Sequence, residues 1–189
     1  LVITHTVQIL VFLHQYNLNK TFKGVGWWLL WSIAESIGFG VMLFRDISSI
    51  LSFIIIIQNS MIVAGTAFLY FGIRRFFNKP LNLKLIVPIG SLFLTSLIYF
   101  LFIDSNIQVR SGIFSATLAI ISFITAYTLF SNKIKSITAS VHFIALIFLI
   151  HGGIFVYRTV ILLIGIPIEN FFNTTMFNMI PYLDALIVS

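Results

Sequence analysis

Three polar side chains stand deep inside long apolar runs of the sequence, where they have the most scope for chemistry. Glu35 lies about nine residues, or about 13 Å, into one such run, and Asn59 and His151 lie at comparable depth in two others. Placing an ionisable group at the centre of a bilayer costs about 2.5–3.5 kcal/mol on insertion scales, so such a residue indicates a function. A carboxylate, an amide and an imidazole that meet at mid-membrane would bind a polar ligand or a proton.

Arg158 extends this set of candidate ligand-binding residues. It follows His151 by seven positions, which places both on one face of a helix, and Gly152 and Gly153 beside them would leave a groove along that face. Two plainer readings stay open. Arg158 would reach toward lipid headgroups or pair with Glu169, and Glu35 would form a hydrogen bond to a neighbouring helix that serves packing alone.

The sequence predicts no metal site, no cofactor and no catalytic centre in this chain. His142 and His151 are nine residues apart and therefore point to opposite sides of a helix, and His5 and His14 have the same spacing. The chain contains no cysteine, so thiolate ligands are absent. No paired nucleophile and base stand at usable spacing.

The elements that must position these residues are transmembrane helices. With 59% hydrophobic and 8% charged residues and a mean hydropathy of +1.08, the chain has too few polar side chains to cover a water-soluble globule. Crossing a hydrocarbon layer of about 30 Å takes roughly 20 helical residues, and alternating barrel strands are absent. We expect an all-α polytopic bundle of seven helices, at about 1–16, 26–44, 50–73, 84–103, 109–131, 138–164 and 174–189.

The basic residues predict the orientation of this bundle, because short loops rich in lysine and arginine stay in the cytoplasm. The first, third and fifth loops hold eight of the eleven basic residues: Lys20, Lys23, Arg74, Arg75, Lys79, Lys84, Lys133 and Lys135. The other loops carry Asp46, Asp104 and Glu169. The amino terminus is therefore predicted outside and the carboxyl terminus in the cytoplasm, with Arg74, Arg75 and Lys79 as a basic anchor on the cytoplasmic side.

The organisation along the chain predicts one transmembrane domain over residues 1–189. The sequence opens on Leu1 and stops within an apolar run at Ser189, so we expect it to be cut at both ends, with a cytoplasmic continuation after the last helix. The net charge of +6 then serves orientation and attraction to anionic lipid, and predicts no nucleic-acid partner.

One series of residues resembles a known class of membrane region. Trp27 and Trp31 begin the second run, Gly38 and Arg45 follow, and Asn59 precedes the segment YFGIRRFFNKP at residues 70–80. This order is similar to the multi-helix (7TM-type) input region that precedes GGDEF diguanylate cyclase domains and histidine kinases in bacterial signalling proteins. The similarity is greatest over residues 26–80. Glu35 departs from it, since that position is mostly apolar in the family.

This resemblance implies a sensory or dimerising bundle in the bacterial inner membrane, whose last helix leads to a cytoplasmic output domain. It also implies a homodimer formed through that output domain, and an unidentified small ligand as the stimulus. Two other functions compete with this interpretation. One is a transporter of small molecules or ions, although no repeat symmetry supports it, and the other is a purely structural anchor that holds the output domain as a dimer.

Overall fold

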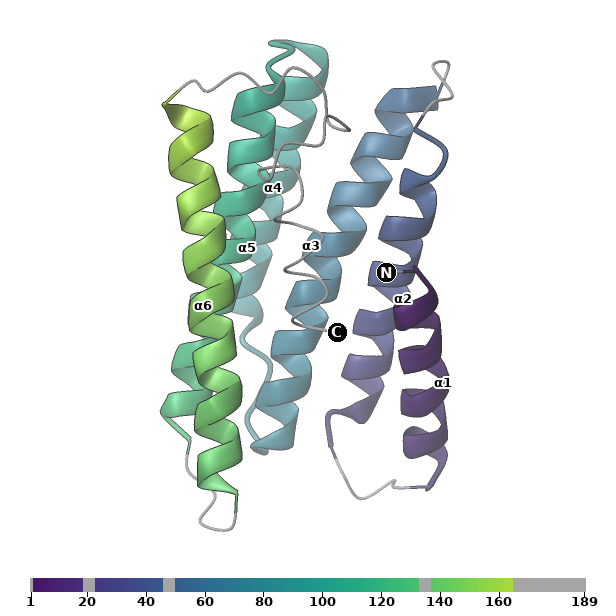
Figure 1. Ribbon diagram of the computed structural model, residues 1–189, viewed down its shortest axis with the longest axis vertical. Coiled ribbons are helices and arrows are strands. Elements are labelled where there is room, and N and C mark those ends of the chain that lie inside the picture. The colour runs from purple at the N-terminus through teal and green to yellow at the C-terminus, as the bar shows by residue number, and fades with distance from the viewer. Residues whose placement is uncertain (1, 19–22, 46–49, 133–136, 165–189) are drawn as a thin grey trace. The chain divides into compact units, whose positions relative to one another are not determined.

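The computed structural model describes residues 2–18, 23–45, 50–132 and 137–164 (Figure 1). These residues form six α-helices, and no strand occurs among them. The helices are α1 (Val2–Leu18), α2 (Val25–Met42), α3 (Leu51–Phe76), α4 (Leu83–Phe102), α5 (Ile107–Phe130) and α6 (Thr138–Leu163).

The predicted all-helical class is confirmed for the described residues. Five helices, α2 to α6, are long and apolar enough to cross a membrane. The helix α1 has 17 residues and carries several polar side chains, and it does not belong to those five. The seventh predicted span, 174–189, lies outside the described residues.

The chain divides into two compact units, residues 1–90 and residues 91–189, and the division falls within α4. In the first unit α2 packs against both α1 and α3, while in the second α5 packs against α6. The single-bundle organisation stays a prediction, and each unit is described by itself below.

Glycine permits a close approach between α2 and α3. A methyl group on Gly72 of α3 would lie 2.3 Å from both Cδ1 and Nε1 of the Trp28 indole. Gly24, just before α2, has a φ of 120°, and a methyl group there would lie 2.5 Å from the Gly72 carbonyl oxygen. Only glycine fits at these two positions, because a side chain would meet the indole in one case and backbone in the other. The start of α2 therefore packs closely against the last turns of α3 at these two glycines.

The segment 70–80 ends α3 through local backbone chemistry. Asn78 adopts a left-handed conformation with a φ of 56°, which asparagine tolerates better than most residues. The backbone N–H of Lys79 then donates to the Arg74 carbonyl at 2.8 Å, as at many helix ends. Pro80 follows, and the Arg74 guanidinium donates through Nε to the Pro80 carbonyl at 2.7 Å. The basic anchor therefore lies at the end of α3, where the chain folds back in a turn.

In the second unit, hydroxyl groups along α5 are satisfied within their own helix. Ser115, Thr117, Thr125 and Thr128 each donate to the carbonyl four residues earlier, at 2.8–2.9 Å. Such bonds let polar side chains lie buried in apolar surroundings, where no water can satisfy them. The helix begins at a conventional cap, since Asn106 Oδ1 accepts from the Val109 N–H at 3.0 Å.

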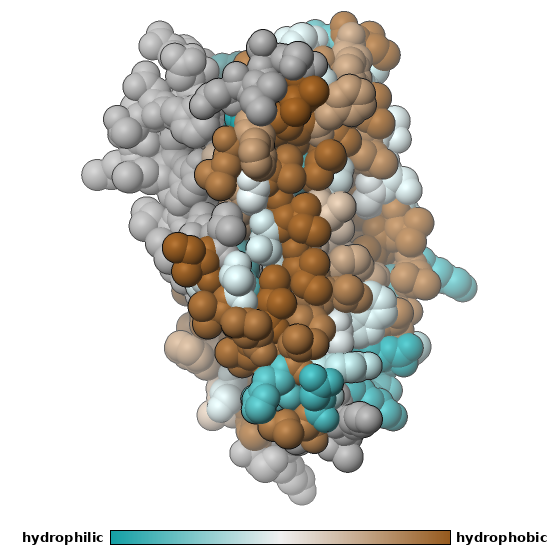
Figure 2. All heavy atoms as spheres, turned by 90° about the vertical axis from the view of Figure 1, so that its right-hand side faces the viewer, coloured by the Kyte–Doolittle hydropathy of each residue, from teal (hydrophilic) through white to brown (hydrophobic). Residues whose placement is uncertain are grey.

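The outward surface of the described helices is apolar. Figure 2 shows brown hydrophobic side chains over the middle of the viewed face, and teal hydrophilic ones gathered near its lower end. On α1 the exposed residues include Ile3, Val7, Leu10 and Leu13. Such a surface is compatible with contact to lipid, because the hydrocarbon layer solvates apolar side chains and offers no hydrogen bonds to polar ones.

Candidate functional site

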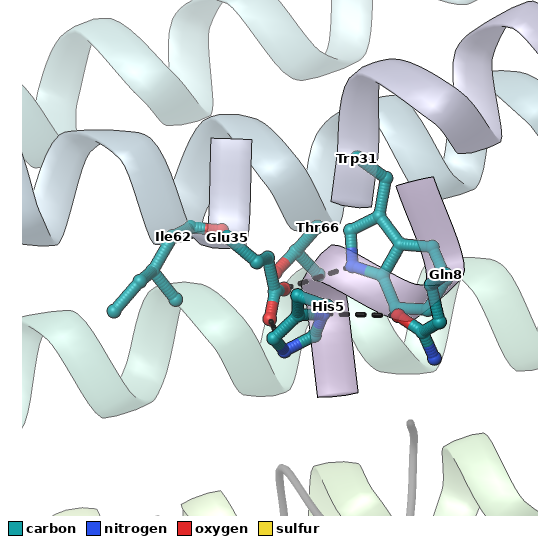
Figure 3. A network of polar contacts seen from close by, with 6 residues as sticks. All are labelled: His5, Gln8, Trp31, Glu35, Ile62 and Thr66. Carbon is teal, nitrogen blue, oxygen red and sulfur yellow. Dashed lines mark hydrogen bonds and ion pairs between the residues drawn. The ribbon is translucent and has the colours of Figure 1, made fainter. Parts of the chain in front are cut away.

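The most distinctive polar contact in the first unit surrounds Glu35. This residue lies on α2, and one of its carboxylate oxygens, Oε1, accepts a hydrogen bond from Nε1 of Trp31 one turn earlier at 2.9 Å. The other oxygen, Oε2, lies 3.4 Å from Nε2 of His5 on α1. Nδ1 of His5 in turn bonds to Oε1 of Gln8 at 3.0 Å. Figure 3 shows the four side chains converging between α1 and α2, a group called here the Glu35 cluster.

The third helix makes room for the carboxylate by lacking a side chain. A methyl group on Gly65 of α3 would lie 2.9 Å from Glu35 Cγ and 3.5 Å from Oε1. Ile62 lies beside this position, and Thr66 donates its hydroxyl hydrogen to the Ile62 carbonyl of its own helix at 3.0 Å. The Glu35 side chain of α2 therefore approaches both His5 of α1 and Gly65 of α3.

The Glu35 cluster is well shielded from solvent. The side-chain exposure is 1% for His5 and 13% for Glu35, and Trp31 is buried. The His5 ring stacks on Phe39 with centroids 5.6 Å apart, and meets Trp31 edge to face at 6.1 Å. Charges in such surroundings interact more strongly than in water, and each is costly without its partner.

Asn59 lies on α3 in the same unit as Glu35 and makes a different bond. Its Nδ2 donates to the Ile55 carbonyl, one turn earlier on α3, at 2.7 Å. Its neighbour Gln58 is buried, and Gln58 Oε1 finds no hydrogen-bond partner among the described residues. This bond ties Asn59 to its own helix, whereas the carboxylate of Glu35 contacts Trp31 and His5.

His151 and Arg158 lie on α6, in the second unit. Nδ1 of His151 lies 2.7 Å from Oγ of Ser122 on α5, and Ser122 also bonds to the Leu118 carbonyl at 2.7 Å. Phe155 packs edge-on against the imidazole with centroids 4.9 Å apart. Arg158 is buried, with 7% exposure, two turns further along the same face. The predicted pairing of Arg158 with Glu169 falls outside the described residues.

The three predicted polar residues are therefore distributed over two units. Glu35 and Asn59 belong to the first unit and His151 to the second, so their meeting in one site stays a prediction. The partner that does meet Glu35 is His5, which sequence reasoning set aside as one of a pair of opposed histidines. His5 and Gln8 lie three residues apart on one face of α1, but this spacing does not indicate that the face meets Glu35. Trp31 is buried and donates its indole N–H to Glu35 inside the first unit.

The basic anchor takes up a defined arrangement at the end of α3. The Arg74 guanidinium lies 5.9 Å from the centre of the Tyr70 ring, and its Nη1 is 3.4 Å from the Tyr70 hydroxyl. Arg75 is exposed and Lys79 is partly exposed. This arrangement leaves positive charge at the surface beside a buried tyrosine.

Within the described parts of the chain, no group of three histidine, cysteine or acidic residues is placed to hold a metal ion. No family model, curated protein or solved structure matches the chain. The chemistry of the Glu35 cluster therefore has to be argued from its own geometry.

Proposed function

We propose that this chain is the membrane-spanning input region of a bacterial signal-transduction protein of the diguanylate cyclase or histidine kinase type. In this proposal, catalysis belongs to a cytoplasmic output domain that is joined after the chain and dimerises. The chain itself receives a stimulus and changes its helix packing. Five helices of membrane-spanning length and apolarity support a location in the inner membrane.

One observation carries the proposal. Glu35 is the only acidic residue within the six described helices, and its carboxylate contacts His5 of a different helix in a shielded position. A contact between charges at this depth is costly to keep and is strong only while both partners hold the right charge. Anything that changes the charge or occupancy of the Glu35 cluster therefore biases the packing of α1 on α2.

Such a bias is the physical requirement for an input device. A stimulus shifts a protein between two states only by the difference in its interaction with each state. A buried polar contact between helices is worth about 0.6–2 kcal/mol in lipid, which corresponds to a roughly three- to thirtyfold change in a two-state equilibrium. The Glu35 cluster meets this requirement, and the proposed relay is a shift of helix packing that reaches the output domain.

The orientation in the membrane is part of the proposal. The amino terminus lies outside, the cluster formed by Arg74, Arg75 and Lys79 faces the cytoplasm, and a seventh helix enters the cytoplasm. We expect a fluorescent reporter inserted after Pro80 to be active in the cytoplasm, and a periplasmic phosphatase inserted after Asp104 to be active outside. The reverse pattern of reporter activities would overturn the orientation and the relay with it.

A fusion to an output domain tests the function. Residues 1–189 are joined to a dimeric histidine kinase output domain whose activity drives a transcriptional reporter. We expect E35Q to change the output about three- to thirtyfold relative to the native sequence at equal membrane levels, because the amide removes the charge and keeps the shape. S36A, the next residue along α2, is the matched control and leaves the output unchanged.

The structural anchor is the competing function, and the same fusion separates the two. If the chain only anchors and dimerises the output domain, E35Q gives the same output as S36A. Replacement of residues 1–189 by an unrelated dimeric anchor would then also preserve the output and its response. Either result would remove the input function.

A further inference from the structure

The Glu35 cluster contains a histidine whose hydrogen position is fixed by its neighbour. Nδ1 of His5 lies 3.0 Å from Oε1 of Gln8. A carbonyl oxygen has no hydrogen to give, so Nδ1 must carry the hydrogen and donate it. In a neutral imidazole the other nitrogen, Nε2, then presents a lone pair. Nε2 is also the His5 atom that lies 3.4 Å from Oε2 of Glu35.

The roles of the two Glu35 carboxylate oxygens are also fixed by a neighbour, which is Trp31. The indole N–H of Trp31 can only donate, so Oε1 of Glu35 accepts at 2.9 Å. Oε2 is then the oxygen placed to carry a proton, and it lies 3.4 Å from His5 Nε2. Nε2 is buried and makes no hydrogen bond among the described residues. Without a hydrogen between them, a lone pair and a carboxylate oxygen face each other.

We infer that His5 and Glu35 form a proton-binding site, which holds one exchangeable proton between Nε2 and Oε2. With the proton bound, the pair is neutral overall, whether the proton resides on the imidazole or on the carboxyl group. When the proton leaves to water, a single negative charge remains between two acceptors. The bound ligand of this site is thus the proton itself.

The surroundings place no second acid or base in the cluster among the described helices. Besides Glu35, α2 has no ionisable residue, and the remaining ionisable residues of α1 are His14 and Tyr16, nine and eleven positions after His5. On α3 the cluster meets Ile62, Gly65 and Thr66. The ionisable residues of α3, which are Tyr70, Arg74 and Arg75, stand in its last two turns. Within these helices, His5 is the titratable side chain that the structure places beside the Glu35 carboxylate.

Loss of the proton has a mechanical consequence. Two acceptors that face each other without a proton between them are unfavourable in an apolar interior, so the unit responds by separating His5 from Glu35 or by admitting water between them. Either response loosens α1 from α2. The proton-binding site deepens the proposed function. It rests on that function in one respect only, namely that the proton is the stimulus which the input region detects. The existence of the site does not depend on any output domain.

Trp31 provides a direct probe, because its indole N–H is bonded to the carboxylate in question. The chain has three tryptophans, so the full chain labelled with ¹⁵N-tryptophan in lipid nanodiscs gives three indole signals, and the one absent from W31F belongs to Trp31. We expect this signal to shift in a single step on titration between about pH 4 and pH 9. The Trp27 and Trp28 signals serve as internal controls and stay in place.

Variants assign the step to the pair. E35Q abolishes the step, H5Q changes its midpoint, and H14Q, on the same helix, leaves it as in the native sequence. E35D keeps a carboxylate and retains a step, which guards against reading a folding failure of E35Q as a loss of the site.

Two outcomes would overturn the inference. One is a Trp31 signal that stays in place over the whole range in the native sequence, and the other is an unchanged step in well-folded E35Q. Either outcome would remove the proton as the ligand and leave the input function to the output fusion, which needs no titration.

Discussion

At the scale of single residues, the contact between Trp28 and Gly72 sets how closely α2 and α3 approach. The indole occupies the space that a methyl group on Gly72 would need. Trp28 is also held by Phe12 and Phe76, with ring centroids at 6.3 Å and 6.0 Å. The ring therefore has little room to withdraw, and any larger residue at 72 pushes the helices apart.

We expect G72A to lower the stability of the first unit by about 1–3 kcal/mol, the usual cost of overpacking a closely packed interface. G40A on α2 is the matched control, because a methyl group there meets nothing within 4 Å. Alanine should be neutral or slightly stabilising at residue 40. Unfolding of both variants in mixed detergent micelles measures the difference, and equal stability of G72A and G40A would contradict the proposed close approach.

The sequence predicts Glu35 as a candidate site residue but does not predict which residue it contacts. Its depth in an apolar run was enough to single it out, because a charge there is costly whatever surrounds it. The sequence does not identify the partner of Glu35, since the choice of His5 depends on how α1 is turned against α2. One histidine of the opposed pair, His5, faces inward and the other, His14, is exposed, and helical spacing alone does not say which.

At the scale of helices, Ser122 and His151 join α5 to α6 in the second unit. If the Ser122 hydroxyl donates to the Leu118 carbonyl, Nδ1 of His151 carries the hydrogen and donates to Ser122 Oγ. Close by, a methyl group on Gly152 would lie 2.8 Å from the Phe123 ring. The helices thus combine one polar bond with small-residue packing, which is how helices associate in lipid.

Replacing Ser122 should therefore cost more than replacing an equivalent serine. We expect S122A to reduce the stability of the second unit by about 0.5–2 kcal/mol relative to S115A. Ser115 is equally buried on the same helix and also donates to the carbonyl four residues earlier, so it matches Ser122 in burial and in this backbone bond. Steric trapping or detergent unfolding measures the difference. If the two variants have equal stability, the bond between α5 and α6 contributes nothing measurable.

Hydropathy predicted the helices well, because the length of an apolar run limits a helix in lipid more strongly than local propensity does. The described helices begin and end within three residues of the predicted spans. The largest difference is at the end of α3, which was expected at residue 73 and continues to Phe76. The basic pair Arg74 and Arg75 reads as a loop by hydropathy, yet the left-handed Asn78 sets the end of the helix.

At the scale of the whole molecule, two units each contain their own buried polar contact. The first unit joins α1 to α2 through His5 and Glu35, and the second joins α5 to α6 through Ser122 and His151. Composition was sufficient to predict membrane-spanning helices, since few charged residues are available to cover a soluble surface. Composition does not predict which helices pack together, because apolar side chains pack almost as well against one neighbour as another.

We propose that His5 and Glu35 act as one contact, which sets the output of a domain fused after residue 189. The most direct measurement is the reporter output of the fusion carrying H5Q, E35Q or both substitutions, at matched membrane levels. If the two residues act through one contact, the double variant gives the same output as E35Q alone, because the second substitution removes nothing further. If instead the two effects multiply, or if neither variant differs from the native sequence, the contact does not control the output and the account is wrong.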